Sequence, residues 1–164
     1  MTNTAERLLP ELDQEMKTTR RLLERVPSDT PDWKPHPKSF SLAHLAQLVA
    51  TMPGWITQTI RKPDIDLATA EGYRNQDTES LLQQFDRHVA EARAAIRETS
   101  DEQFGTNWSL KMGEHVIMTL PRDVAVRQHL NHFCHHRGQL TVYLRLLDVP
   151  IPSIYGPTAD EKWG

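Results

Sequence analysis

The chain has 164 residues, of which 38% are apolar and 25% charged, with a net charge of −3 and one cysteine. This length and balance are typical of one globular domain, and they carry no electrostatic signature of nucleic-acid or anionic-membrane binding. The single cysteine excludes an internal disulfide, the polar N-terminal residues are unlike a signal peptide, and no apolar run approaches the roughly 20 residues that span a bilayer. We therefore expect a cytoplasmic protein without nucleic-acid or membrane partners.

Four segments place apolar residues at three- and four-residue spacing, the pattern of amphipathic helices that pack on one another. In chain order they cover residues 5–26, 39–60, 78–99 and 121–148. Pro53 and Gly54 interrupt the second segment, where we expect a kink or a second short helix. Four long helices, with a long connection between the second and third, predict an all-α four-helix bundle formed by a single domain over residues 1–164.

The segments between these helices are predicted to be irregular or extended. The loop over residues 27–39 contains four prolines, and its Trp33 is predicted to pack as a lid over one end of the bundle. Residues 107–119 hold two β-capable runs around Met112 and Gly113, which predicts a small hairpin or extended excursion before the last helix. The proline-rich tail over residues 149–164 is expected to lie extended along the bundle surface.

The last predicted helix concentrates histidines. Four of the chain's eight histidines fall within eight residues: His129, His132, His135 and His136. His132 and His136 are four residues apart, about 40° around a helix, so both imidazoles can reach one ion. An apolar stripe adjoins them, so we expect the pair to face a pocket at the bundle interior. Because a useful metal site normally has three protein ligands, the pair alone is an incomplete signature.

Three neighbours of the pair have separate predicted roles. Cys134 points away from the histidines on a helix, which favours a small buried or interface residue over a nucleophile. Arg137 falls in the apolar stripe and is predicted to pair with a carboxylate, since an unpaired buried guanidinium is costly. Gly138 costs a helix about 1 kcal/mol relative to alanine, and close packing of helices, including packing across a dimer interface, is a reason to keep it.

Three stretches together resemble the DinB-like family of the DinB/YfiT-like superfamily. They are LLPELDQEM, WKPHPKSFSLAHLAQLVATMPGW and NHFCHHRGQLTVYLRLLDVPIPSIYGPTADE, so the resemblance covers nearly the whole chain. It implies an up-down-down-up four-helix bundle, commonly dimeric, with a divalent metal such as nickel or zinc held by three histidines. Some superfamily members resemble metal-dependent thiol transferases that use bacillithiol or mycothiol.

The family pattern places two metal ligands on the last helix and one on the second. The two on the last helix correspond to His132 and His136. The second-helix position is Leu48 in this chain, and the nearest histidine is His44, one turn and about 6 Å earlier along the axis. The predicted metal ligands are therefore His44, His132 and His136. Other candidates for the third ligand are His129, His115 and water.

Two hypotheses of function follow from these residues. The first is a metal-dependent transferase or hydrolase, of the thiol-transferase kind, that acts on a small molecule or thiol through the histidine site. The second is a metal-free homodimer that binds a small ligand or a partner, because an apolar Leu48 fills space where the family pattern has a ligand. The sequence identifies neither the catalytic residues nor the substrate.

Overall fold

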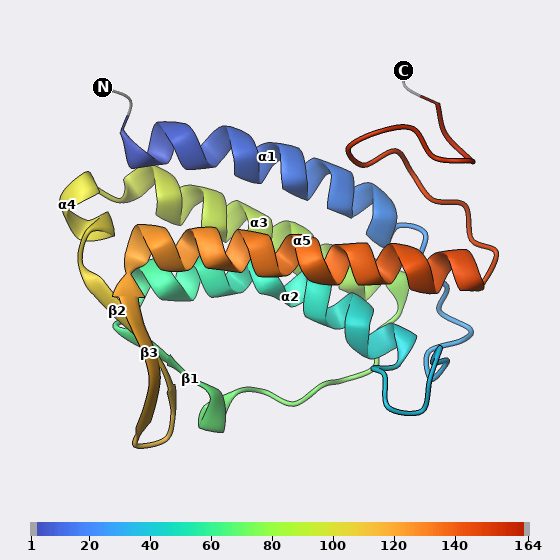
Figure 1. Cartoon of the computed structure of the whole chain (residues 1–164), viewed down its shortest axis with the longest axis horizontal. Helices are drawn as coiled ribbons and strands as arrows, with labels where there is room; N and C mark the ends of the chain where they lie inside the picture. The colour runs from blue at the N-terminus through green and yellow to red at the C-terminus, as the bar shows by residue number, and fades with distance from the viewer. Residues whose placement is uncertain (1–2, 163–164) are drawn as a thin grey trace.

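The computed structural model describes residues 3–162, which fold around a bundle of four long helices (Figure 1). These helices are α1 (Thr4–Leu23), α2 (Leu42–Arg61), α3 (Thr78–Glu98) and α5 (Arg122–Leu146). α1 and α5 run in one direction and α2 and α3 in the other (Figure 1). α2 packs against both α3 and α5, and α1 packs against α3. None of the helices in the described part is long and apolar enough to span a membrane.

A small sheet accompanies the bundle, so the protein is mostly helical and the all-α prediction is too narrow. The strands are β1 (Asp64–Asp66), β2 (Asn107–Met112) and β3 (His115–Pro121), and the short helices are η1 (Leu67–Thr69) and α4 (Asp101–Phe104). β2 and β3 form the predicted antiparallel hairpin, which Gly113 turns with a φ of 59°. The sequence does not predict β1, which pairs in parallel with β2, because three residues with two aspartates have little β propensity.

The first three long helices each begin at a capping side chain. The caps are Asn3, Ser41 and Asp77, and each accepts a hydrogen bond from the backbone N–H three residues further on. At α1, Glu6 also accepts from the backbone N–H of Asn3 at 3.1 Å, which completes a capping box. These caps satisfy backbone donors that no helical carbonyl can reach, and they set where each helix starts.

α2 continues through Pro53 and Gly54 as one helix, so of the two predicted alternatives the second short helix is wrong. Both residues are buried. A Cβ at Gly54 would lie 3.3 Å from the ring of His88, which reaches across from α3. The glycine therefore permits close approach of α2 and α3, and this packing maintains the helix although Pro53 donates no backbone hydrogen bond.

The irregular segments are fixed to the bundle ends. Trp33 packs edge-on against Tyr143 with ring centroids 5.6 Å apart, which confirms its predicted position over one end. The C-terminal tail, described as far as Lys162, is tied back by an ion pair between Glu161 and Arg21 at 2.5 Å. A second ion pair joins Asp160 of the tail to Arg145 near the end of α5. The tail is therefore held against both α1 and α5.

Candidate metal centre

The predicted histidine pair forms on α5. His132 and His136 lie one helical turn apart, and their Nε2 atoms are 2.8 Å from each other. His136 is buried, with 9% of its surface exposed, whereas His132 is exposed to solvent. The ring of His132 also lies against that of Trp55 on α2, with centroids 5.8 Å apart. The four-residue spacing thus brings the two Nε2 atoms together at the junction of α5 and α2.

Gln139 holds the ring of His136 in place. Its Oε1 lies 2.8 Å from His136 Nδ1 and accepts that atom's proton. In this arrangement the Nε2 of neutral His136 carries a lone pair, which accepts the Nε2 proton of His132. A ligand nitrogen oriented by a hydrogen bond from its other ring nitrogen is a recurrent feature of metal sites. This contact was not predicted from the sequence, although the three-residue spacing of His136 and Gln139 on one helix face is compatible with it.

Both imidazoles of the pair favour the neutral form. Burial lowers the pKa of His132, and the nearby rings of His136 and His135 lower it further. Burial also lowers the pKa of His136, although the hydrogen bond to Gln139 acts in the opposite direction. Neutral imidazole is the form that binds a metal or accepts a proton, so the pair is available for either role at neutral pH.

His129, one turn before the pair, is engaged elsewhere. Its Nε2 lies 2.9 Å from the hydroxyl oxygen of Thr59, a fully buried residue of α2. Its ring also contacts Trp108 edge-on, with centroids 5.6 Å apart. Burial, followed by the charge of His132, lowers its pKa to about 4. His129 is thus a neutral interior side chain with a partner of its own, and its contacts do not bring it to the pair.

His44 is held in an aromatic stack on the other side of the junction. Its ring lies between Phe40, at 4.3 Å between centroids, and Tyr73, at 4.5 Å. Burial, followed by the charge of Lys34, lowers the pKa of His44. The structure therefore brings His132 and His136 together but leaves His44 in a different set of contacts, and its role as third ligand stays a prediction.

The contacts between α2 and α5 explain this separation. The two helices are antiparallel, with Thr59 against His129 and Trp55 against His132. Continued along the two helices, this register places Leu48 level with Gln139 and Leu140, beyond the pair, and places residues 51–55 of α2 level with the pair itself. His44 lies a full turn beyond Leu48, at the end where Tyr143 donates to the backbone carbonyl of Phe40. The stretch of α2 level with the pair therefore contains no histidine, and Leu48 packs against the core.

The remaining histidines do not complete a three-ligand set. His115 is exposed in the hairpin opposite Met112, and His36 is exposed in the loop before α2. Over residues 3–162, no three histidine, cysteine, aspartate or glutamate side chains are arranged to hold one metal ion. The residues thus fit a site with two protein nitrogens and do not fit the three-histidine site that the family resemblance implies.

The opposite face of α5 carries the predicted partner of Arg137. The buried guanidinium pairs with Glu15 of α1 at 2.5 Å and also donates to the phenol oxygen of Tyr155 at 2.7 Å. Cys134 lies in the same cluster, with its sulfur 3.5 Å from a Glu15 oxygen, and burial raises the pKa of its thiol. These contacts confirm the carboxylate prediction for Arg137, and they show Cys134 turned away from the histidine pair as predicted.

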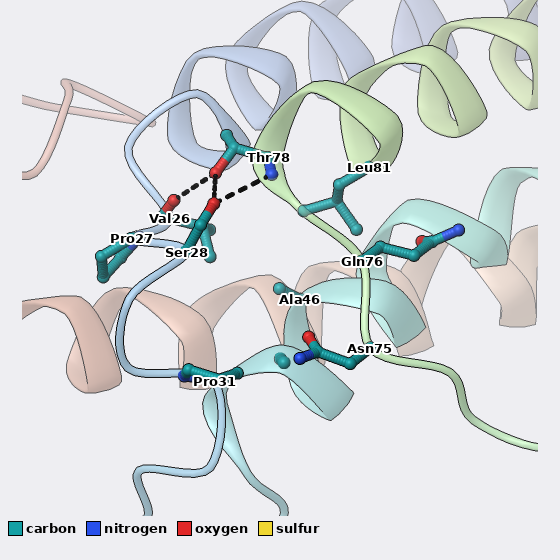
Figure 2. Close-up of a pocket in the computed structure, with 10 residues that line it drawn as sticks. Val26, Pro27, Ser28, Pro31, Ala46, Asn75, Gln76, Thr78 and Leu81 are labelled. Carbon is teal, nitrogen blue, oxygen red and sulfur yellow. Dashed lines mark hydrogen bonds between the residues drawn. The ribbon is translucent and has the colours of Figure 1, made fainter.

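A small hollow at one bundle end does not belong to this site (Figure 2). It lies between the loop after α1, the start of α2 and the segment before α3, where Thr78 joins Ser28 at 2.7 Å and Val26 at 2.8 Å. Its free volume of about 10 Å³ accommodates about one water molecule. No histidine lines it, so it has no part in the chemistry of the pair.

Several solved structures are similar to this chain. A DinB-like protein from Bacillus cereus is 19% identical with a TM-score of 0.70, over 90% of this chain and 95% of that one. A DinB-like protein from Bacillus subtilis is 17% identical with a TM-score of 0.68, over 87% and 92% of the two chains. A mycothiol-dependent maleylpyruvate isomerase is 15% identical with a TM-score of 0.58, over 85% of this chain and 63% of that one.

These structures share the fold of this chain, whereas no curated protein sequence matches it. The family model described as the DinB family matches residues 1–163. A match over nearly the full length confirms the family that the sequence motifs indicate. The chain belongs to the DinB family.

Proposed function

We propose that this chain is a DinB-family enzyme, a transferase or hydrolase that acts on a small molecule at the His132–His136 pair. The observation that carries the proposal is the 2.8 Å approach of the two Nε2 atoms, with His136 oriented by Gln139. Two neutral imidazoles that converge at a solvent-accessible junction can bind an ion or transfer a proton. A purely structural histidine pair needs neither exposure of one ring nor a fixed orientation of the other.

We further propose that the pair binds a divalent metal, nickel or zinc, through the two Nε2 atoms. The ion would replace the proton that His132 donates to His136. Its remaining coordination positions would be left to water or to the substrate. When bound, such a metal supplies Lewis acidity or lowers the pKa of a coordinated water or thiol. Gln139 contributes by holding His136 with its Nε2 lone pair directed at the site.

A low-molecular-weight thiol is the proposed co-substrate class. The support is the shared fold with a protein described as a mycothiol-dependent maleylpyruvate isomerase. The chain's own Cys134 does not supply this thiol, because it lies in the Arg137–Glu15 cluster and burial raises its pKa. A thiol substrate would therefore have to come from solution, and the exposed side of His132 leaves it access.

A metal-free ligand-binding protein is the second candidate, and a specific observation favours it. The hydrogen bond between His132 and His136 satisfies both facing nitrogens without an ion. Leu48 of α2, at the position where the family pattern has a third histidine, packs against the core. Under this reading the junction binds a small molecule through hydrogen bonds from the two imidazoles.

Zinc and nickel titration of tag-free protein separates the two candidates. Isothermal calorimetry should show binding of one ion per chain that His136→Ala abolishes. His135→Ala is the matched control, because His135 is exposed and adjacent but does not take part in the Nε2 contact. Loss of binding in His44→Ala would instead show that His44 leaves its aromatic stack to complete the site. Absence of binding in the unaltered protein would favour the metal-free candidate.

A further inference from the structure

The stretch of α2 beside the histidine pair carries no formal charge. Only the last residue of α2, Arg61, is an aspartate, glutamate, lysine or arginine, and it pairs with Glu98 of α3 at 3.2 Å. α1 and α3 differ, because their exposed positions are rich in charge, as is usual for bundle helices. These exposed charged residues are Glu6, Arg7, Asp13, Lys17, Asp86, Arg87, Glu91 and Arg97. The partly exposed positions of α2 hold uncharged side chains instead, which requires an explanation.

The part of α5 that carries the pair is uncharged as well. Residues 128–136 contain no aspartate, glutamate, lysine or arginine. The flanking charges are engaged on other faces, since Arg127 forms an ion pair with Glu11 of α1 and Arg137 is buried in its own ion pair with α1. Burial and then the neighbouring imidazoles lower the pKa of His132, and in the described part of the chain no charged side chain contributes. A ligand at the pair therefore meets neutral groups from both helices.

Trp55 of α2 places a flat apolar surface next to the pair. The centroid of its ring lies 5.8 Å from that of His132 and 6.0 Å from that of His129. The side chain is half-buried, so part of the indole is accessible to solvent. An indole packs favourably against another aromatic ring and carries no charge. It thus offers a platform for a ring beside the nitrogens that would hold the reacting end of a ligand.

Gln128 adds a neutral hydrogen-bonding group to the same side of α5. It is exposed and precedes His132 by four residues, which places it one turn along the helix and about 40° around it. An amide donates and accepts hydrogen bonds without a charge. On a surface of amide, indole and imidazole groups, a charged group of a ligand would lose its hydration without gaining a partner.

We propose that the molecule bound at the pair has no formal charge apart from the atom that it presents to the two Nε2 atoms, and that an aromatic ring of its body lies on Trp55. This inference rests on the proposed function and narrows its substrate class. Carboxylate, phosphate and ammonium groups on the body of the molecule are selected against. Trp55 is a specificity-determining residue, because it contacts the ring of the substrate and not the reacting atom.

Three thiols that differ in one substituent test the selection against charge. They are benzyl mercaptan and its 4-carboxylate and 4-trimethylammonium derivatives, titrated by NMR into the full chain first without added metal, so that the charge of an ion does not bias the comparison, and then with zinc. Benzyl mercaptan should bind about tenfold more tightly than either charged probe. Gln128→Lys should strengthen binding of the carboxylate probe about threefold and leave that of benzyl mercaptan unchanged.

Changes at Trp55 test the platform. Trp55→Ala should weaken binding of benzyl mercaptan about tenfold, whereas Trp55→Phe, which keeps a ring, should weaken it much less. Phe40→Ala is the matched control, because it removes a ring that is 45% exposed and lies before the start of α2, and it should leave binding unchanged.

Several outcomes would overturn the inference. They are equal or tighter binding of a charged probe, no binding of benzyl mercaptan, equal binding to Trp55→Ala and the unaltered protein, and binding that survives His136→Ala. A tenfold preference for benzyl mercaptan in a protein that takes up no zinc would support the inference while contradicting the metal part of the proposed function.

Discussion

Removing the charge of Glu15 should lower the free energy of unfolding more than removing the charge of a carboxylate in an exposed ion pair. The side chains of Arg137 and Glu15 are only 2% and 11% exposed, and their 2.5 Å contact joins α5 to α1. Glu15→Gln keeps the shape but leaves a buried guanidinium without its counter-charge. Breaking one partner of a buried pair costs about 3–5 kcal/mol of unfolding free energy. For a domain of this size that corresponds to a fall in Tm of roughly 6–20 °C.

Differential scanning calorimetry and urea unfolding at pH 7 measure the effect. Asp13→Asn is the matched control, since Asp13 pairs with Arg93 at 2.9 Å between α1 and α3 but both side chains are over 40% exposed. Solvent screens such a pair, so the control should lower Tm far less. Equal Tm losses in the two variants would refute the reasoning that Arg137 depends on Glu15 inside the fold.

Three further predictions concern the histidines and their neighbours. Leu48→His should raise zinc affinity roughly tenfold or more in a chelator-competition assay, because it restores a histidine where the family pattern has its second-helix ligand; unchanged affinity would show that a side chain at this position of α2 does not reach the pair. Gln139→Leu should weaken metal binding about 10- to 100-fold by calorimetry, since His136 loses its orienting acceptor; an unaffected Kd would show that the contact is incidental. His129→Gln should flatten the pH dependence of stability measured by urea unfolding between pH 6.5 and 4. Burial depresses the pKa of His129 to about 4 in the folded state, so the unfolded chain takes up a proton first and stability is lost as pH falls through this window. A variant with the same pH profile as the unaltered protein would rule this out.

The contacts within α5 and the turn of the hairpin could be predicted from the sequence. The i,i+4 spacing fixes the relation of His132 to His136 once a helix forms, and the apolar stripe on the same helix indicates that Arg137 is buried and needs a counter-ion. Both expectations depend only on helical geometry, and the contacts on α5 confirm them. The hairpin around Gly113 is likewise a local signal, set by a residue that tolerates positive φ.

The contacts between segments far apart in the sequence could not be predicted from the sequence. Which residues of α2 stand level with the pair depends on the register of α2 against α5, which contacts such as Thr59 with His129 determine. The stacking of Tyr73 on His44 depends on the path of the segment between η1 and α3, for which the sequence has no periodic signal. Local propensity at Pro53 and Gly54 predicts a kink or a second short helix, and packing between helices keeps α2 a single helix there.

The most direct test of the central claim is the metal content of tag-free protein, measured by elemental mass spectrometry after incubation with zinc or nickel and removal of the excess. We predict close to one ion per chain, lost in His132→Ala and in His136→Ala and retained in His135→Ala. An ion that remains after both single changes in the pair, or a protein that takes up no metal under these conditions, would contradict the claim that the His132–His136 pair is a metal centre.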